Sequence, residues 1–282
     1  MRKLLLLVNP NAGQRKVNKT LTDIIGIFNE GGYEVTVFLT NGPGNGTKIV
    51  QERAADYDLV VCAGGDGTLN ATITGVLRAG ASCPVGYIPC GSTNDFASTL
   101  KLSTDVVQAA KDIMLGKPIP YDVGRWNYRY FTYIASFGAF TRVSYTTPQN
   151  LKNALGHLAY VLSGITEIPQ IRSIPMSLEL DGEPVEGKYL FGAVSNSTSV
   201  GGVFTLNPRL VDLQDGKFEV ILVRLPRDMA EVAQCAAALQ HQTYDCPSIT
   251  FRSVSRLTVR QDPGLVWTLD GERAEGAEEL HI

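Results

Sequence analysis

The stretch with the clearest chemical signature is GGDGTLN, Gly64–Asn70. It follows a short apolar run, Leu59–Ala63, which is typical of a buried strand in a parallel sheet, and it precedes a predicted helix, Asn70–Ala79. Glycines allow a ligand to approach the backbone closely, and a helix start presents amide N–H groups and the positive end of a dipole. This combination is suited to binding a phosphate group.

An acidic residue lies inside this phosphate-binding pattern. A bare Asp66 carboxylate would repel a phosphate, so its position makes chemical sense if it holds Mg²⁺, directly or through water. The alternative is a tight turn between strand and helix in which Asp66 acts as a cap. The two flanking glycines, the acid, a third glycine and a hydroxyl together favour a nucleotide site.

The first part of the chain alternates strands with helices. We predict strands at Lys3–Val8, Glu34–Thr40, Leu59–Ala63, Val85–Pro89 and Ile119–Gly124, and helices at Val17–Glu30, Thr47–Asp56, Asn70–Ala79 and Thr104–Leu115. Such alternation indicates a parallel sheet covered on both faces, with ligands outside the carboxyl ends of its strands. Polar clusters follow four of the strands, at Asn9–Gly13, Thr40, Gly64–Asn70 and Gly91–Asp95.

After about Gly124 the pattern changes to short strands separated by turn signals such as Asp181-Gly182 and Asp215-Gly216. The predicted strands are Tyr128–Phe137, Pro175–Leu180, Tyr189–Ser195, Phe218–Leu225, Ile249–Phe251, Leu257–Arg260 and Leu265–Leu269, and the predicted helical inserts are Leu151–Ile168 and Asp228–Gln242. The sequence therefore predicts an α/β nucleotide-binding domain (residues 1–124) followed by an antiparallel β-sandwich domain with helical inserts (residues 125–282).

Composition excludes some classes of partner. The net charge of −3 gives no bulk attraction to nucleic acid or to an anionic membrane, so we expect no nucleic-acid partner. No apolar run reaches the length of a membrane span, and Asn9-Pro10 ends the N-terminal LLLLV run too early for a signal peptide. The five cysteines have no Cys-x-x-Cys spacing, which indicates reduced thiols and a cytoplasmic location.

Seven motifs occur in order along nearly the whole chain. They are NPNAG (Asn9–Gly13), GGDGTLN (Gly64–Asn70), CGSTNDFA (Cys90–Ala97), YDVGRW (Tyr121–Trp126), SFGAFTRVSY (Ser136–Tyr145), LQDG (Leu213–Gly216) and LDGE (Leu269–Glu272). In this order and spacing the set resembles the diacylglycerol kinase catalytic domain family, the soluble lipid kinases of bacteria, which are related to sphingosine and ceramide kinases. The family architecture is a nucleotide-binding α/β domain followed by a β-sandwich domain.

The resemblance implies an ATP site formed through backbone amides and hydroxyl groups. Its residues would be Asn9, Pro10, Asn11, Ala12, Gly13, Thr40, Gly64, Gly65, Asp66, Gly67, Thr68, Leu69, Asn70, Ala71, Ser92 and Asn94. The resemblance also implies an acidic network around a catalytic Mg²⁺, formed by Asp66, Asp95 and Asp122. Taken alone, Asp95 is better explained as a helix cap before Phe96-Ala97, and Asp122 as part of a turn at a strand end.

A second, structural Mg²⁺ is implied in the later domain, held by Asp215 and the backbone carbonyls of Asp212 and Lys217. The alternative at this position is a hairpin turn, because Asp-Gly is common in hairpins. The family also usually runs one further strand beyond the Glu279–Ile282 segment.

Asp270 and Glu272 would supply the general base that accepts the proton of the lipid hydroxyl, and the sequence leaves open which of them does so. The same tripeptide occurs at Asp181-Gly182-Glu183, where it indicates a plain hairpin turn. Only the family register, and the position near the chain end, favours the second copy.

The function implied is phosphoryl transfer from ATP to the hydroxyl of diacylglycerol or a similar lipid alcohol, dependent on Mg²⁺. The acceptor would be a membrane lipid, reached by a cytoplasmic protein that is transiently peripheral to the membrane, and a homodimer is allowed. The apolar positions of Leu151–Ile168 have helical spacing and either face acyl chains or pack on the sandwich. Two alternatives remain: a soluble-metabolite kinase of the NAD kinase or phosphofructokinase type, against which CGSTNDFA and LDGE argue, and a non-catalytic nucleotide-binding regulator.

Overall fold

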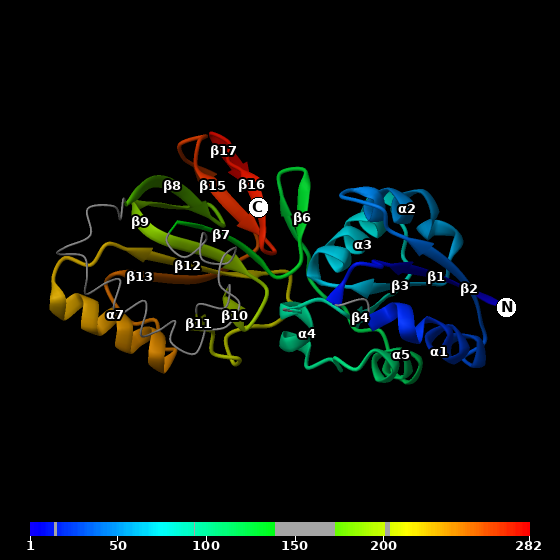
Figure 1. The fold of residues 1–282 in the computed structure, drawn as a ribbon. Coiled ribbons are helices and arrows are strands. Elements are labelled where there is room, and N and C mark those ends of the chain that lie inside the picture. Colours follow the sequence, from blue (N-terminus) through cyan, green and yellow to red (C-terminus); the bar gives the residue numbers. More distant parts are fainter. Residues whose placement is uncertain (14–15, 93, 139–172, 201–203) are drawn as a thin grey trace. The chain divides into compact units, whose positions relative to one another are not determined.

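The computed structural model describes residues 1–13, 16–92, 94–138, 173–200 and 204–282 (Figure 1). The chain divides into two compact units, Met1–Ile119 (unit 1) and Pro120–Ile282 (unit 2). Each unit has its own hydrophobic core. The predicted helix Leu151–Ile168 and all of the SFGAFTRVSY motif after Gly138 lie outside the described residues.

Unit 1 is built on a parallel sheet with the strand order β2-β1-β3-β4. Its strands are β1 (Arg2–Val8), β2 (Tyr33–Leu39), β3 (Leu59–Gly64) and β4 (Val85–Pro89). Its helices are α1 (Lys16–Glu30), α2 (Asn45–Arg53) with a following 3₁₀ turn, η2 (Ala54–Asp56), α3 (Asp66–Ala79), α4 (Asp95–Leu100) and α5 (Val106–Leu115). The predicted α/β fold is confirmed.

Both faces of this sheet are covered, and the sequence pattern shows why. Leu4 and Leu6 of β1 pack in one core cluster with Phe28 of α1 and Ala109 of α5. The alternate residues Leu5 and Leu7 point to the opposite face, where a side-chain atom of Leu7 lies against Gly46 of α2. Helices α2 and α3 lie together on that face, and α1 and α5 on the other (Figure 1). A strand buried on both faces is therefore a continuous apolar run.

Unit 2 contains a large antiparallel sheet with the path β16-β15-β7-β9-β8-β14-β17, from which β12 joins β9 and β13 joins β12. The strands are β7 (Ile134–Gly138), β8 (Ile174–Leu180), β9 (Glu183–Ser195), β12 (Phe218–Arg224), β13 (Ile249–Val254), β14 (Leu257–Arg260), β15 (Val266–Leu269), β16 (Glu272–Glu275) and β17 (Glu279–His281). Two small ribbons accompany it, β5 (Gly124–Trp126) with β6 (Arg129–Phe131), and β10 (Ser199–Val200) with β11 (Phe204–Thr205). The predicted antiparallel β domain is confirmed.

Alternation along the strands separates the two faces of the large sheet. Ile221 of β12 packs in the cluster that includes Leu239 of α7 (Met229–His241), so α7 covers this face. Val220 and Leu222, on either side of it, belong to the opposite cluster, in which Trp267 is almost fully buried. The predicted helix Asp228–Gln242 corresponds to α7, because Asp228 accepts a hydrogen bond from the amide of Glu231 as its N-cap.

Two local strand predictions were wrong. The predicted strand Ile119–Gly124 does not form, and the first strand here begins at Gly124, because Pro118 and Pro120 flank an exposed Ile119 and cannot donate to a sheet. The predicted single strand Tyr128–Phe137 is divided into β6 and β7. At Asp215-Gly216, the hairpin turn that was left open as an alternative does not form: the segment is a bend, and the next strand, β12, pairs with β13 and β9.

Helix prediction was less accurate near the site. Helix α3 begins at Asp66 rather than at Asn70, and α4 was anticipated only through the alternative that Asp95 caps a helix. No helix among the described residues combines the length and the apolar character that crossing a membrane requires.

Candidate active site

Three loops with glycines meet at the carboxyl edge of the sheet in unit 1, after β1, β3 and β4. The amide of Asn9 donates to the carbonyl of Ala63 (2.9 Å), and the amide of Cys90 donates to the carbonyl of Gly64 (2.7 Å). The amide of Thr40, after β2, donates to the carbonyl of Val8 (2.9 Å). The predicted polar clusters therefore follow neighbouring strands along one edge.

Glycine is required at several points because these backbones touch one another. Gly13 has a φ of +47°, and a Cβ there would overlap the carbonyl oxygen of Cys90. A Cβ on Gly91 would lie 2.6 Å from the Cα of Gly65, and one on Gly64 would overlap the side chain of Thr68. The loops thus form a bare backbone surface next to the amino end of α3, and a side chain in place of these glycines would clash with neighbouring atoms. These features fit the phosphate groups of a nucleotide.

Two asparagine side chains of this edge shape the loops. The Oδ1 atom of Asn9 accepts from the amide of Asn11 (3.0 Å). Asn94, in the left-handed region with a φ of +54°, accepts from the amide of Gly91 (2.8 Å) and donates to its carbonyl (3.0 Å). The hydroxyl of Tyr87, whose pKa burial raises, donates to the same Asn94 oxygen (3.3 Å). Asn94 is therefore a residue that builds the loop around Gly91.

Asp66 is the first residue of α3, after the N-cap Gly65. Its Oδ2 atom accepts from the amide of Asp95 (3.1 Å) and its Oδ1 atom from the amide of Phe96 (3.3 Å). The N-cap of α4, Asn94, makes no side-chain capping bond of its own, so Asp66 caps α4 from a distant part of the chain. The structure thus brings Asp66 next to Asp95, whereas Asp122 belongs to unit 2.

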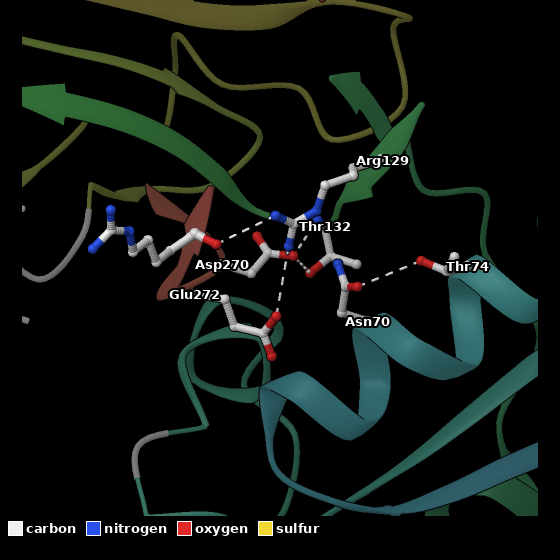
Figure 2. A network of polar contacts seen from close by, with 7 residues as sticks. Asn70, Thr74, Arg129, Thr132, Asp270 and Glu272 are labelled. Atoms are coloured by element: carbon white, nitrogen blue, oxygen red, sulfur yellow. Dashed lines mark hydrogen bonds and ion pairs between the residues drawn. The ribbon is translucent and has the colours of Figure 1, made fainter. Parts of the chain in front are cut away.

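The other predicted residues of unit 1 divide by exposure. Leu69 is almost fully buried, and Thr68 is largely buried, with its hydroxyl accepting from Asn9 (3.4 Å). Gly67 and Ser92 are exposed. The Oδ1 atom of Asn70 accepts from the hydroxyl of Thr74 (3.4 Å), as Figure 2 shows. Partly exposed backbone or side chains are found at Pro10, Ala12 and Ala71.

The two Asp-Gly-Glu copies have the same local conformation in unit 2. Both form tight hairpins with two successive residues at positive φ, +49° and +93° at Asp181-Gly182 and +47° and +83° at Asp270-Gly271. The Asp181 carboxylate is exposed and accepts from the amides of Ser255 and Arg256. Only their surroundings distinguish the two copies.

Asp270 is 7% exposed, and its carboxylate lies beside Thr132 (Figure 2). Its Oδ2 atom accepts from the amide and the hydroxyl of Thr132 (2.6 and 2.8 Å), and its Oδ1 atom from the amides of Tyr133 (2.9 Å) and Ile134 (3.1 Å). Burial raises the pKa of the Asp270 carboxyl, and these hydrogen bonds oppose that rise. The three successive amides form a nest for an anion, which also explains why β6 and β7 are separate strands.

Glu272 lies two residues further on, at the start of β16, and has the opposite character. Its side chain is 67% exposed, and its Oε2 atom lies 3.7 Å from a guanidinium nitrogen of Arg129 (Figure 2). Arg129 also donates to the backbone carbonyl of Arg273 (3.3 Å). Of the two predicted base residues, Glu272 is the one whose carboxylate is accessible.

The predicted second metal position is a bend whose side chains bind its own backbone. Asp215 accepts from the amide of Lys217 (2.9 Å), Asp212 from the amide of Gln214 (3.2 Å), and Asp122 from the amide of Gly216 (2.7 Å). In the part of the chain that the structure describes, no three His, Cys, Asp or Glu side chains gather in a group that could hold a metal ion.

Sequence reasoning missed several buried polar groups in unit 2. Glu219 of β12 is 1% exposed, and burial raises the pKa of its carboxyl to about 7, with Asp215 and Asp212 adding to the rise. Tyr121 and Asn196 are also hydrogen-bonded in the interior, where burial and the nearby carboxylates of Asp270 and Asp122 raise the pKa of the Tyr121 hydroxyl. The polar run Ser195–Ser197 directly after an apolar strand was the available signal.

Comparisons with known proteins agree with this architecture. Residues 3–126 match the family model "Diacylglycerol kinase catalytic domain", and residues 134–278 match "YegS C-terminal NAD kinase beta sandwich-like domain". A diacylglycerol kinase of Bacillus subtilis (strain 168) is 32% identical over 275 residues, which cover 96% of this chain and 90% of the relative. A diacylglycerol kinase of Staphylococcus aureus (strain MRSA252) is 30% identical, covering 95% and 85%.

A similar fold has been solved. The crystal structure of a diacylglycerol kinase from Bacillus anthracis str. Sterne superposes with a TM-score of 0.72 at 22% identity, covering 99% of this chain and 93% of that one. At this identity the structural similarity supports only the assignment of the fold. Membership of a family is supported by the family models and by the relatives of 30% identity or more. The chain belongs to the diacylglycerol kinase catalytic domain family.

Proposed function

We propose that this protein transfers the γ-phosphoryl group of ATP to the hydroxyl of diacylglycerol or a similar lipid alcohol, in a reaction that needs Mg²⁺. Membership of the family makes the chain a lipid kinase. The observation that carries the nucleotide assignment is the close backbone contact of the loops at Gly13, Gly65 and Gly91 beside the amino end of α3. Such a surface presents backbone amides to phosphate oxygens without intervening side chains.

Asp66 and Asp95 are the groups of unit 1 that would hold Mg²⁺. Because no three acidic side chains gather at one point among the described residues, the ion would keep several water ligands, as Mg²⁺ commonly does. The ion would offset the negative charge of the phosphates beside the carboxylates. Asp122 is proposed as a further member of this network, and Asp212, Asp215 and Lys217 as the holders of a structural Mg²⁺ in unit 2.

We assign the general base to Glu272 and a supporting role to Asp270. A base must have an oxygen free to approach the acceptor hydroxyl. Both oxygens of Asp270 already accept two hydrogen bonds each, whereas the Glu272 side chain is 67% exposed. Glu272 would take the proton as the hydroxyl oxygen bonds to phosphorus, and Asp270 would hold the turn that carries it.

The acceptor is proposed to be a membrane lipid, so the protein would act at a membrane surface as a transiently bound cytoplasmic enzyme, and the proposal allows a homodimer. Transfer of ³²P from labelled ATP to a panel of lipid alcohols in mixed micelles tests it, with and without Mg²⁺. NAD and a sugar phosphate serve as control acceptors. Labelling of these soluble acceptors, with none of any lipid, would contradict the proposal.

A further inference from the structure

A buried polar cluster joins two functional regions within unit 2. Thr132, Ser195, Asn196 and Ser197 are completely buried, and Tyr121 reaches into the same cluster. Buried polar groups stabilise a unique geometry only when their hydrogen bonds are made, so a cluster of this kind fixes the atoms at its ends.

One end of the cluster holds the segment that binds Asp270. The amides of Thr132 and Tyr133 donate to the Asp270 carboxylate, so their carbonyl groups point elsewhere. The Thr132 carbonyl lies 3.0 Å from the Tyr121 hydroxyl, and the Tyr133 carbonyl accepts from the amide of Asn196 (3.0 Å) and the hydroxyl of Ser195 (3.1 Å). The segment is therefore held from both sides.

The other end of the cluster holds Asp122 and the acidic bend. The Nδ2 atom of Asn196 donates to the carbonyls of Asp122 (2.9 Å) and Leu213 (3.3 Å). The amide of Asp122 donates to the same Leu213 carbonyl (2.9 Å). The Oδ2 atom of Asp122 accepts from the amide of Gly216 (2.7 Å). Tyr121 directly precedes Asp122 in the chain, and its hydroxyl reaches the Thr132 carbonyl at the other end of the cluster. Tyr121 therefore connects the two ends.

We propose that Tyr121 is a positioning residue, whose single hydroxyl fixes the Thr132–Ile134 segment and thereby the turn that carries Glu272. The hydroxyl lies within hydrogen-bond distance of two buried carbonyls, those of Thr132 (3.0 Å) and Asn196 (2.8 Å), which share its one hydrogen. Without it these carbonyls lose their donor, and the Thr132 segment shifts to reach water. Asp270 then shifts with the segment, because four of its hydrogen bonds end there. This inference rests on the proposed role of Glu272 as base.

Tyr121→Phe tests the inference, because it removes the hydroxyl and keeps the ring. Tyr244→Phe is the matched control, since the Tyr244 hydroxyl is also buried in unit 2 and bonds one backbone group, the amide of Asn207 (3.0 Å). We expect Tyr121→Phe to lower kcat about tenfold to a hundredfold, with the KM for ATP changed less than about twofold, because a misplaced base affects the chemical step. Tyr244→Phe should retain the kcat of the unaltered protein.

A double variant separates positioning from a general loss of structure. If Tyr121 acts through Glu272, then Tyr121→Phe should lower the residual kcat of Glu272→Gln by less than about twofold. Amide hydrogen exchange of the full chain adds a readout that does not need activity. Exchange at Thr132, Tyr133 and Ile134 should accelerate at least about tenfold in Tyr121→Phe and remain unchanged in Tyr244→Phe.

The two proposals fail in different ways. The positioning role would be overturned if the exchange rate at these three amides were unchanged in Tyr121→Phe. It would also be overturned if Tyr121→Phe lowered kcat by the same factor in the unaltered protein and in Glu272→Gln. Absence of lipid phosphorylation by the unaltered protein would instead overturn the proposed function, and the exchange rates would still decide whether Tyr121 holds the segment.

Discussion

The role of an acidic residue in this protein depends on the donors around it more than on its local sequence. Asp181 and Asp270 begin the same tripeptide in the same turn, yet Asp181 is exposed and Asp270 is buried among four donor groups. The sequence could predict both turns, because Asp-Gly favours positive φ at two successive positions. It could not predict the donors, because Thr132 and Ile134 are distant in the chain.

Exchanging each carboxylate for its amide should separate the roles of Glu272 and Asp270. Glu272→Gln should lower kcat at least about a hundredfold, because the base is lost, while the free energy of unfolding stays within about 0.5 kcal/mol. Asp270→Asn should lower the free energy of unfolding by about 2–4 kcal/mol, because an NH₂ group would face backbone donors. Urea denaturation and steady-state kinetics check both. Full stability of Asp270→Asn with a lost kcat would instead support Asp270 as the base.

The charge of Asp66 should matter more than its hydrogen bonds. Asp66→Asn keeps an oxygen that can accept from the amides of Asp95 or Phe96, but it loses the charge that attracts Mg²⁺. We expect turnover to fall at least about a hundredfold while the circular dichroism spectrum is unchanged. Asp58→Asn is the control, since Asp58 is an exposed residue of unit 1 that also accepts a backbone amide, that of Lys3. Near-normal turnover in Asp66→Asn would exclude the metal role.

At the scale of elements, local patterns predicted the strands better than the helix starts. Helix α3 begins at Asp66, because Gly65 is its N-cap and has an extended backbone. The apolar periodicity that predicted this helix begins only later in the sequence. Helix α4 has only the span Asp95–Leu100 and is capped by Asp66, so its one local signal was the candidate cap at Asp95. The loops that follow β3 and β4 therefore depend on each other, a dependence that a pass along the sequence does not reveal.

This dependence predicts a specific effect of Gly91→Ala. The new Cβ would lie 2.6 Å from the Cα of Gly65 and 2.7 Å from Oδ1 of Asn94, so the two loops must separate. We expect the KM for ATP to rise at least about tenfold, because backbone amides would move away from the phosphates. The control is Gly26→Ala in α1, where a Cβ meets nothing within 4 Å. It should leave the KM unchanged and stabilise the protein by roughly 0.5–1 kcal/mol. An unchanged KM in Gly91→Ala would place the nucleotide elsewhere.

At the scale of the molecule, the sequence predicted the two classes of sheet because each is encoded by local alternation. Continuous apolar runs such as Leu4–Val8 indicated the parallel sheet, and alternating strands joined by turns indicated the antiparallel one. What it could not predict are the pairings of β9, which joins β8 along its first half and β7 and β12 along its second. Glu219 lies on the pairing of β12 with β9, opposite Ser195, and Asn196 directly follows β9. Tyr121 reaches Asn196 and Thr132 from outside the strands, so these contacts could not be predicted from the sequence.

Glu219 should make the stability of the whole protein depend on pH. Burial raises the pKa of its carboxyl from an ordinary 4.5 to about 7 in the folded state, so between these values the folded state binds more protons than the unfolded state. The contribution of Glu219 to the free energy of unfolding should therefore be highest below about pH 4.5. It should fall by about 1–3 kcal/mol as the pH rises through 7.

Glu219→Gln should remove this fall, since the amide stays neutral at every pH. The measurement is urea denaturation between pH 5 and pH 8 with a chelator present, so that no cation neutralises Asp212 and Asp215. Glu179→Gln on β8 is the control, because Glu179 is exposed and should leave the pH dependence of the unaltered protein intact. Oε2 of Glu219 makes no hydrogen bond within the described residues, and burial outweighs the hydrogen bonds that lower the pKa of this carboxyl, among them one with Ser253. The variant should therefore be the more stable protein at pH 8. Equal slopes against pH for Glu219→Gln and the unaltered protein would show that this carboxyl is already ionised at pH 5 in the folded state.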